Sequence, residues 1–446
     1  MREERTIQAS IFDVFSQHEL GRELKAMSDL LDDHRAVCDW VAAELRRHGL
    51  KPTGRKGLAA ETVLRCGLLK QHRQLSYQEL AFYLTDSASF RAFARLPVHW
   101  TPKKSVLQNT ISAISAATWE RINRHLLQQA RTAKFESGAM LRVDSTVTDA
   151  PIHPPTDSSL LWDSVRMMVR LLGEADDLLA GLPWCNHSRR AKKRSQSIQF
   201  CRSADKRKKL YRDLLKVARA TLDYLDAVMA RLTAAPPADI KREAWLAAVR
   251  HYRPLVERII AQTERRVLDG EPVPAADKLV SLFEPHTDII VKGSREVQYG
   301  HKLNLSTGKT GMILDLVIEA GNPADADRFQ PMLDRHIAHY GKAPRQSAAD
   351  GGYASTANLA RAKALGVGDV AFHKKRGLKI EDMVKSRWVY RKLRNFRAGI
   401  EANISCLKRA YGLGRCTWKG LDHFKAYVWS SAVAYNLALF ARLKPT

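Results

Sequence analysis

The chain has 446 residues, of which 45% are hydrophobic and 27% charged. These proportions are those of a folded protein and exclude wholesale disorder, and the length predicts two or three domains. The 73 Lys and Arg outnumber the 47 Asp and Glu, and this net charge of +26 favours a polyanionic partner. The N-terminal residues lack the apolar run of a signal peptide, and the six cysteines are scattered, which predicts a cytoplasmic protein with reduced thiols.

Residues from about 10 to 135 are predicted to be helical, because apolar residues recur there at helical spacing. A helix is expected at 61–69, and Ser76 and Glu79 have the spacing of a capping box that begins the next helix. One long amphipathic helix is expected from 106 to about 133. Short helices joined by tight turns occur in DNA-binding modules and also in helical bundles of any function, but the net charge favours DNA contact.

A strand is predicted at residues 140–148, where apolar and β-branched residues alternate. Asp144 lies in its middle, and because an unpaired buried carboxylate is costly, we expect it to meet a cation, a metal or a hydrogen-bond network. A helical region follows, with a stop at 269–270. It carries the densest basic cluster of the chain, Arg189, Arg190, Lys192, Lys193 and Arg194, followed by Lys206, Arg207, Lys208 and Lys209. Such a run can be a solvated surface, but the overall charge favours contacts with phosphates.

Strand-like periodicity returns after residue 297. Further strands are predicted at 297–306, 311–318, 346–349 and 369–372, of which the first two form a β-hairpin around a turn at 307–309. Helices are expected at about 325–340, 356–365 and 395–408. Residues 426–441 carry no charge, but they include polar residues and fall short of the about 20 apolar residues of a membrane span, which predicts a buried core helix.

The helix at 395–408 organises the candidate site. Arg397, Glu401 and Lys408 fall on one stripe of such a helix, and an apolar stripe lies beside them, formed by Phe396, Ile400, Ile404, Leu407 and Tyr411. An ordinary amphipathic helix with a solvated charged face would have the same pattern. The helix can therefore present one carboxylate flanked by two cations while its other face enters a core.

The order of elements permits three carboxylates to converge. Asp144 on a central strand, Asp350 after a parallel neighbour and Glu401 on a helix packed across them would meet at the carboxyl end of the sheet. Each could instead be a strand-end cap, a turn residue or a surface ion-pair partner. Three converging carboxylates need cations, and oxygen ligands suit Mg²⁺ or Mn²⁺, with two ions expected for chemistry at phosphorus.

These segments resemble known signatures. Residues 142–146, 349–353 and 395–408 resemble the three signature regions of bacterial insertion-sequence transposases of the DDE type, and 152–163, 279–292 and 299–302 resemble the ISNCY group in particular. The resemblance implies a ribonuclease H-like catalytic domain in which Asp144, Asp350 and Glu401 bind the catalytic metals. It also implies that Arg397 and Lys408 belong to a Tyr-Arg-Glu-Lys signature and contact DNA. Arg394 stands where that signature has Tyr, so the role of the Tyr does not carry over.

The predicted fold is therefore α/β: a ribonuclease H-like domain with a mixed five-stranded sheet, interrupted by a large helical insert and preceded by an all-α region. The expected divisions are a DNA-binding region at 1–135, the first catalytic strand and loop at 136–155, the basic insert at 156–290, and the rest of the catalytic domain at 291–446. The insert lies between the first two strands, whereas better-known relatives have one between the second Asp and the Glu. Domain roles in that region are therefore not transferred.

The predicted function is that of a metal-dependent transposase that binds the terminal inverted repeats of an insertion sequence, cleaves strands at its ends and joins them to target DNA. Its expected partners are double-stranded DNA, as transposon ends and as target, and further copies of itself on that DNA. A nucleoid-associated protein of the bacterial cytoplasm with no membrane contact is expected. A non-catalytic DNA-binding regulator derived from a transposase, or a ribonuclease H-like nuclease, are the alternatives.

Overall fold

The computed structural model describes residues 18–47, 57–97, 100–179, 181–234, 239–292, 296–373 and 376–443. The predicted helicity of residues 10–17 falls outside these ranges. The chain divides into two compact units, one formed by Met1–Ala150 with His301–Thr446 and the other by Pro151–Gly300. None of the described helices is long and apolar enough to cross a membrane.

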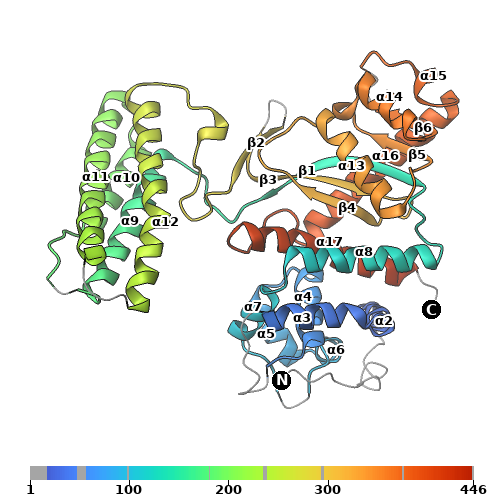
Figure 1. The fold of residues 1–446 in the computed structure, drawn as a ribbon, viewed down its shortest axis with the longest axis horizontal. Coiled ribbons are helices and arrows are strands. Elements are labelled where there is room, and N and C mark those ends of the chain that lie inside the picture. The colour runs from blue at the N-terminus through green and yellow to red at the C-terminus, as the bar shows by residue number, and fades with distance from the viewer. Residues whose placement is uncertain are drawn as a thin grey trace. The chain divides into compact units, whose positions relative to one another are not determined.

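The first part of the larger unit is helical (Figure 1). Its helices are α2 (Glu19–Asp33), α3 (Ala36–Arg47), α4 (Ala60–His72), α5 (Tyr77–Asp86), α6 (Ala88–Phe93), α7 (Lys104–Ile111) and α8 (Ala116–Thr132). The predicted capping box is confirmed, because Ser76 and Glu79 bond to each other's backbone N–H groups. The prediction of a single long helix from 106 to 133 is wrong, because the chain forms two helices there, α7 and α8. The Ser112 hydroxyl donates to the Gln108 carbonyl at the end of α7, and the Ser115 side chain accepts from Thr118 N–H and starts α8.

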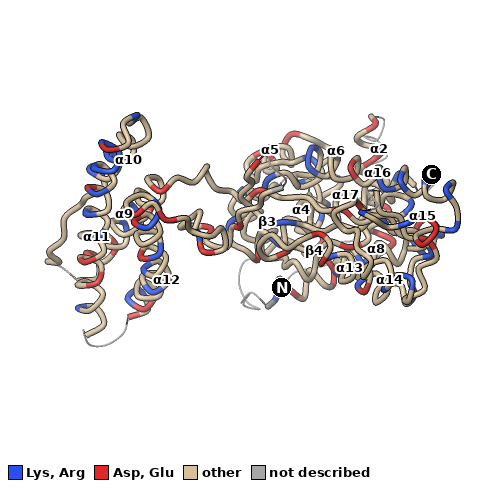
Figure 2. The backbone as a smooth tube through the Cα atoms, turned by 90° about the horizontal axis from the view of Figure 1, so that it is seen from above, with Lys and Arg blue, Asp and Glu red and all other residues tan. Residues whose placement is uncertain are grey.

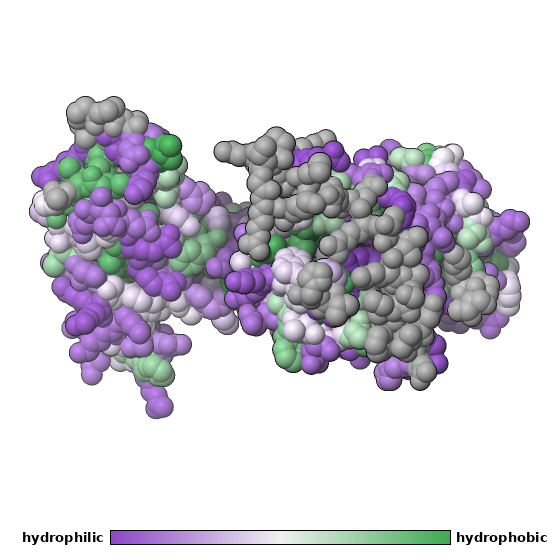
Figure 3. Space-filling model, turned by 90° about the horizontal axis from the view of Figure 1, so that it is seen from below, coloured by the Kyte–Doolittle hydropathy of each residue, from purple (hydrophilic) through white to green (hydrophobic). Residues whose placement is uncertain are grey.

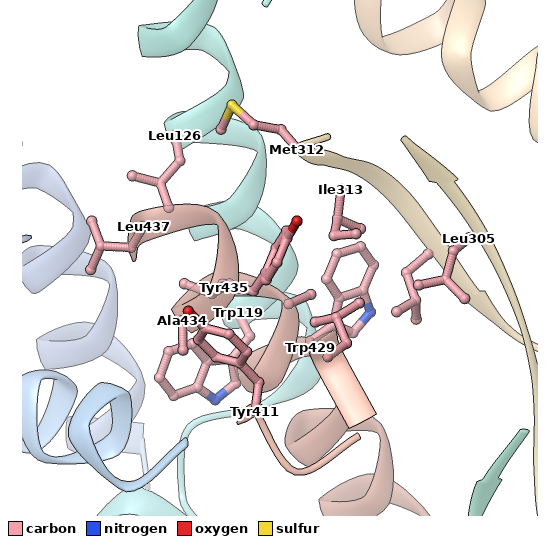
Figure 4. Packing of buried hydrophobic residues seen from close by; sticks show 14 of the residues in the cluster. Trp119, Leu126, Leu305, Met312, Ile313, Tyr411, Trp429, Ala434, Tyr435 and Leu437 are labelled. Atoms are coloured by element: carbon pink, nitrogen blue, oxygen red, sulfur yellow. The ribbon is translucent and has the colours of Figure 1, made fainter. Parts of the chain in front are cut away.

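A nearly fully buried helix joins this helical part to the sheet. This helix, α17 (Leu421–Leu443), packs against α8, α4, α2 and strand β4. Figure 4 shows its side chains Trp429 and Leu437 among residues from α8 and the sheet. Asn436 is fully buried and accepts a hydrogen bond from Ile313 N–H, which ties the helix to the sheet. The prediction that 426–441 is a buried core helix is confirmed.

The sheet has six strands, one more than predicted. They are β1 (Met140–Asp149), β2 (Asp288–Lys292), β3 (Glu296–Thr307), β4 (Ile313–Ile318), β5 (Gln346–Ala349) and β6 (Asp369–Phe372). The order is β2-β3-β1-β5-β6, and β4 also pairs with β3. The missed strand is β2, whose five residues lie at the edge of the sheet and pair antiparallel with the first half of β3. The predicted hairpin is confirmed as the antiparallel pair β3–β4.

Helices after the sheet strands complete the larger unit. They are α13 (Ala326–Tyr340), α14 (Thr356–Ala364), α15 (Ile380–Met383) and α16 (Arg387–Ala410), with a 3-10 turn at Gly351–Tyr353. α16 packs against β1, β5 and β6, and residues of its predicted apolar stripe are buried. Ile400 and Leu407 are fully buried, and Phe396 and Ile404 pack against the core. The result is a mixed α/β fold with a helical N-terminal region, as predicted.

The smaller unit is a helical bundle with its own core. Its long helices are α9 (Asp157–Asp176), α10 (Ser188–Phe200), α11 (Ala204–Ala234) and α12 (Ile240–Thr263). Leu161, Met168 and Leu214 are fully buried or nearly so, and Trp245 donates from its indole nitrogen to the Leu171 carbonyl at 2.7 Å. A π-helical turn, Glu264–Leu268, and the 3-10 turn Ala275–Asp277 follow. The view in Figure 3 shows a mostly hydrophilic face on this unit.

Candidate active site

The parallel pair β1–β5 brings two of the three predicted carboxylates together. Its last paired residues are Val143 and Ala349, so Asp144 and Asp350 are the next residues on the two neighbouring strands. The Asp144 carboxylate accepts a hydrogen bond from Ser145 N–H at 2.8 Å. Asp350 stands just before the turn Gly351–Tyr353, at the carboxyl end of β5, which is where sites in such sheets tend to lie.

Arg142 fixes the third element, α16, against β1. Its side chain is buried and donates to Thr307 Oγ1 at 2.6 Å, to the Phe396 carbonyl at 2.7 Å and to Asn403 Oδ1 at 2.7 Å. The guanidinium also lies over the Phe396 ring. Burial lowers the pKa of Arg142, but a guanidinium stays charged far above neutral pH. Arg142 on β1 thus binds α16 at Phe396 and at Asn403, which lie before and after Glu401 in the helix.

Gly399 is the residue of α16 that lets Arg142 approach. A Cβ at this position would overlap Arg142 Nη1 and would lie 3.1 Å from its Cζ. Sequence reasoning missed both Arg142 and Gly399 as positioning residues. The available signals were a glycine inside an amphipathic helix and an arginine within a predicted strand, and neither identifies its partner.

Arg397 connects all three acidic residues. Its Nη2 lies 3.0 Å from Asp144 Oδ2 and 3.6 Å from Asp350 Oδ1, and its Nη1 donates to Glu401 Oε1 at 2.6 Å. Of the partners expected for Asp144, a cation, a metal or a hydrogen-bond network, the structure shows a cation. The side chains of Arg397 and Asp144 are 11% and 14% exposed, whereas those of Asp350 and Glu401 are 41% and 62% exposed. The cluster is thus buried at Asp144 and open to solvent at Glu401.

Lys408 lies on the same stripe of α16 as Glu401, about two turns further along the helix, and within the ranges that the structure describes it forms no ion pair with this cluster. Burial lowers the pKa of Lys408, and the nearby Asp149 carboxylate opposes that effect. Burial likewise raises the pKa of Asp149, while Lys408 and Arg415 oppose it. Asp149 and Arg415 also form a β-bridge. Lys408 is therefore placed beside the end of β1, with Asp149 as its electrostatic neighbour.

The donor set suits a hard divalent cation, because three carboxylates supply only oxygen ligands. In the described part of the chain, however, no group of three or more His, Cys, Asp or Glu lies close enough to hold a metal ion. The positive charge among Asp144, Asp350 and Glu401 is the Arg397 guanidinium. The residues fit the metal by chemistry, and their side chains are arranged around an arginine.

The predicted basic cluster lies on α10, in the smaller unit. Arg190 and Arg194 both pair with Asp213 of α11, whereas Arg189, Lys192 and Lys193 are exposed and form no ion pair with any described residue. Figure 2 shows Lys and Arg distributed along α10 and α12. The cluster thus offers three free cations and two that already have a counter-ion.

A pocket of about 580 Å³ lies where α10 ends and α11 begins. Arg194, Lys206, Lys209 and Asp213 line it, together with Phe200, whose side chain is among the exposed large hydrophobic groups at 81%. Such a volume would accommodate a small ligand or a segment of a larger one. Its lining carries more positive than negative groups, in keeping with the surface around it.

Two segments of the chain match known families. Residues 261–437 match the family described as Transposase DDE domain, and residues 18–113 match the family described as Transposase domain (DUF772). The first match includes Asp350 and Glu401, and the second covers most of the helical N-terminal region. No curated protein and no solved structure matches the chain. The two family matches span more than half of the residues and agree with the mixed α/β fold, and the chain therefore belongs to the insertion-sequence transposases of the DDE type.

Proposed function

We propose that this transposase binds the terminal inverted repeats of its own insertion sequence, cleaves strands at the two ends and joins the freed 3′ hydroxyls to target DNA. The observation that carries the proposal is the convergence of Asp144, Asp350 and Glu401 on one guanidinium. A regulator that only binds DNA has no need for three carboxylates at the end of a sheet. A simple nuclease has no need for the helical region and the basic insert.

Asp144, Asp350 and Glu401 would hold Mg²⁺ or Mn²⁺, with two ions expected. When bound, these ions would supply Lewis-acid activation of the attacking oxygen and stabilisation of charge on the leaving oxygen. The chain's own contribution is position. β1 and β5 bring the two aspartates to the ends of neighbouring strands, and Arg142 holds α16, whose Arg397 contacts both aspartates and Glu401. Small displacements of such groups are costly in rate, so this support is part of the proposed mechanism.

The DNA would be held by cations on both units. Arg397 and Lys408 are proposed to contact phosphates of the DNA backbone, and so are Arg189, Arg190, Lys192, Lys193 and Arg194. The helical N-terminal region is proposed to bind the transposon ends. The net charge of +26 supports this assignment, because release of counterions from DNA drives such binding. Two copies of the chain are proposed to assemble with two ends bound, as the DDE transposases in general do.

The test uses purified protein, Mg²⁺ or Mn²⁺, and labelled duplexes copied from the inverted repeats that flank the coding sequence. Cleavage is resolved on denaturing gels, and binding is measured separately by fluorescence anisotropy. Three substitutions each neutralise one proposed metal ligand: Asp144→Asn, Asp350→Asn and Glu401→Gln. Each is expected to reduce the cleavage rate by at least about 100-fold while leaving DNA binding intact, because the bound metal stabilises the transition state by several kcal/mol.

Glu381→Gln is the matched control, since Glu381 is an exposed carboxylate on α15 in the same unit and contacts none of the three. It should cleave as the wild-type protein does. Binding without cleavage by the wild-type protein would support the regulator instead. Cleavage that survives any of the three neutralising substitutions would refute the assignment of that residue.

A further inference from the structure

We propose that Arg397 is an internal counter-ion that assembles the three carboxylates before a metal arrives and releases them when a divalent cation binds. This inference rests on the proposed function, because it assumes that Asp144, Asp350 and Glu401 are the metal ligands. It differs from a role in DNA contact, since it assigns the guanidinium to the acidic residues of the metal-free protein.

Charge explains why a cation is needed at this place. Three carboxylates that converge without a counter-ion would repel one another. Arg397 places one positive charge among them through two nitrogens, Nη1 and Nη2. The guanidinium fork suits this task because it presents several donors in a fixed plane. The guanidinium thereby holds the three carboxylates together when no metal is bound.

Arg397 pairs with one oxygen of each of the three carboxylates. Arg397 engages Asp144 Oδ2, Asp350 Oδ1 and Glu401 Oε1, so a cation bound to these atoms must compete with it. Among the described residues, no group of three His, Cys, Asp or Glu is arranged to hold a metal ion, and the cation that contacts all three acids is Arg397. A metal that binds these three oxygens therefore requires the Arg397 side chain to move.

The surroundings allow that movement without unfolding. The side chains of Glu401 and Asp350 are 62% and 41% exposed, so both can rotate. The helix α16 itself is held in place by Arg142. The guanidinium is also incompletely satisfied. Its Nε is buried and has no hydrogen-bond acceptor in the described structure, which carries a cost that an incoming anionic oxygen could relieve. A DNA phosphate next to the site would be such an acceptor.

The test measures metal binding in the absence of DNA, so its readout is independent of catalysis. Mn²⁺ is titrated into the full-length protein by isothermal calorimetry, and the rise of Tm with Mn²⁺ is recorded in parallel. Arg397→Gln is expected to bind Mn²⁺ at least about tenfold more tightly than the wild-type protein, because the metal no longer displaces an ion pair. The same variant should have a lower Tm without metal and a larger rise of Tm with it.

Arg394→Gln is the matched control. Arg394 lies one turn earlier on α16, is exposed, and lies near the Tyr390 ring without pairing with the carboxylates. Its Mn²⁺ affinity should equal that of the wild-type protein. Should Arg397→Gln fail to fold, Arg397→Lys is measured instead. It keeps the charge but not the fork, and an intermediate gain in affinity is expected.

Unchanged or weaker Mn²⁺ binding by the folded Arg397 variant would overturn the inference. Asp144→Asn in the same titration separates this failure from a failure of the proposed function. Wild-type affinity in Asp144→Asn would show that the metal site lies elsewhere, and the proposed function would lose its site. Loss of binding in Asp144→Asn without a gain in the Arg397 variant would refute the counter-ion role alone.

Discussion

Gly399 lies in the middle of α16, at the point where the Arg142 guanidinium reaches the helix. In an exposed helix interior, replacing Gly by Ala stabilises a protein by up to about 1 kcal/mol. The opposite is expected for Gly399→Ala. The new methyl group would overlap Arg142 Nη1, which donates to the Phe396 carbonyl, and the guanidinium cannot retreat while it also bonds Thr307 and Asn403.

The size of the effect follows from these bonds. A hydrogen bond to a charged group contributes about 1.5 to 3 kcal/mol, and the methyl group should break at least the one made by Nη1. After the gain in helix propensity of up to about 1 kcal/mol is subtracted, Gly399→Ala should destabilise the larger unit by about 0.5 to 2 kcal/mol. Because α16 must shift to relieve the overlap, Glu401 should move and DNA cleavage should fall as well.

Urea unfolding followed by fluorescence measures the stability, with Gly173→Ala as the control. Gly173 is a helical glycine of α9 with no atom within 4 Å of its would-be Cβ, so alanine should be neutral or stabilising there. The decisive comparison repeats Gly399→Ala in an Arg142→Met background, where the obstacle is gone and the loss should disappear. A Gly399→Ala protein as stable as the Gly173→Ala protein would refute the role assigned to Arg142.

Two further predictions concern charge. The double variant Lys192→Gln, Lys193→Gln should reduce the steepness of the plot of log K for DNA binding against log salt by about two, since each exposed lysine releases about one counterion on contact with a phosphate. The control Arg253→Gln should leave the slope unchanged, because the Arg253 guanidinium is already paired with Asp226. Equal slopes in the double variant and the control would exclude Lys192 and Lys193 from the DNA interface. Burial lowers the pKa of His336 to about 4, below its value near 6.5 in the unfolded state. As pH falls, His336 is therefore protonated in the unfolded state before it is protonated in the folded state. The contribution of neutral His336 to the free energy of unfolding is complete above pH 6.5 and should be lost as pH falls from about 6.5 to 4, by up to about 3 kcal/mol. Chemical unfolding at several pH values should show this decline in the wild-type protein and a smaller decline in His336→Gln.

Local signals were sufficient for most elements of the fold. β5 and β6 begin and end at the residues predicted from the sequence, and the capping box at Ser76 starts its helix. The two errors have local causes as well. The helix expected from 106 to 133 is interrupted by Ser115, which caps α8 although the apolar spacing continues across the break. β2 is a five-residue edge strand, too short for its period to stand out.

The sequence predicts which residues form the candidate site, but it does not predict the contacts between them that depend on the tertiary structure. The spacing of Arg397 and Glu401 on one helical stripe predicts their ion pair, which is a property of α16 alone. The contacts of Arg397 with Asp144 and Asp350 depend on the parallel register of β1 and β5 and on the distance between α16 and the sheet. That distance is set by Arg142 and by the missing side chain of Gly399, which are more than 250 residues apart. No periodicity encodes such a pair, so the sequence predicts a carboxylate flanked by cations, and only the tertiary structure places one of those cations among all three acids.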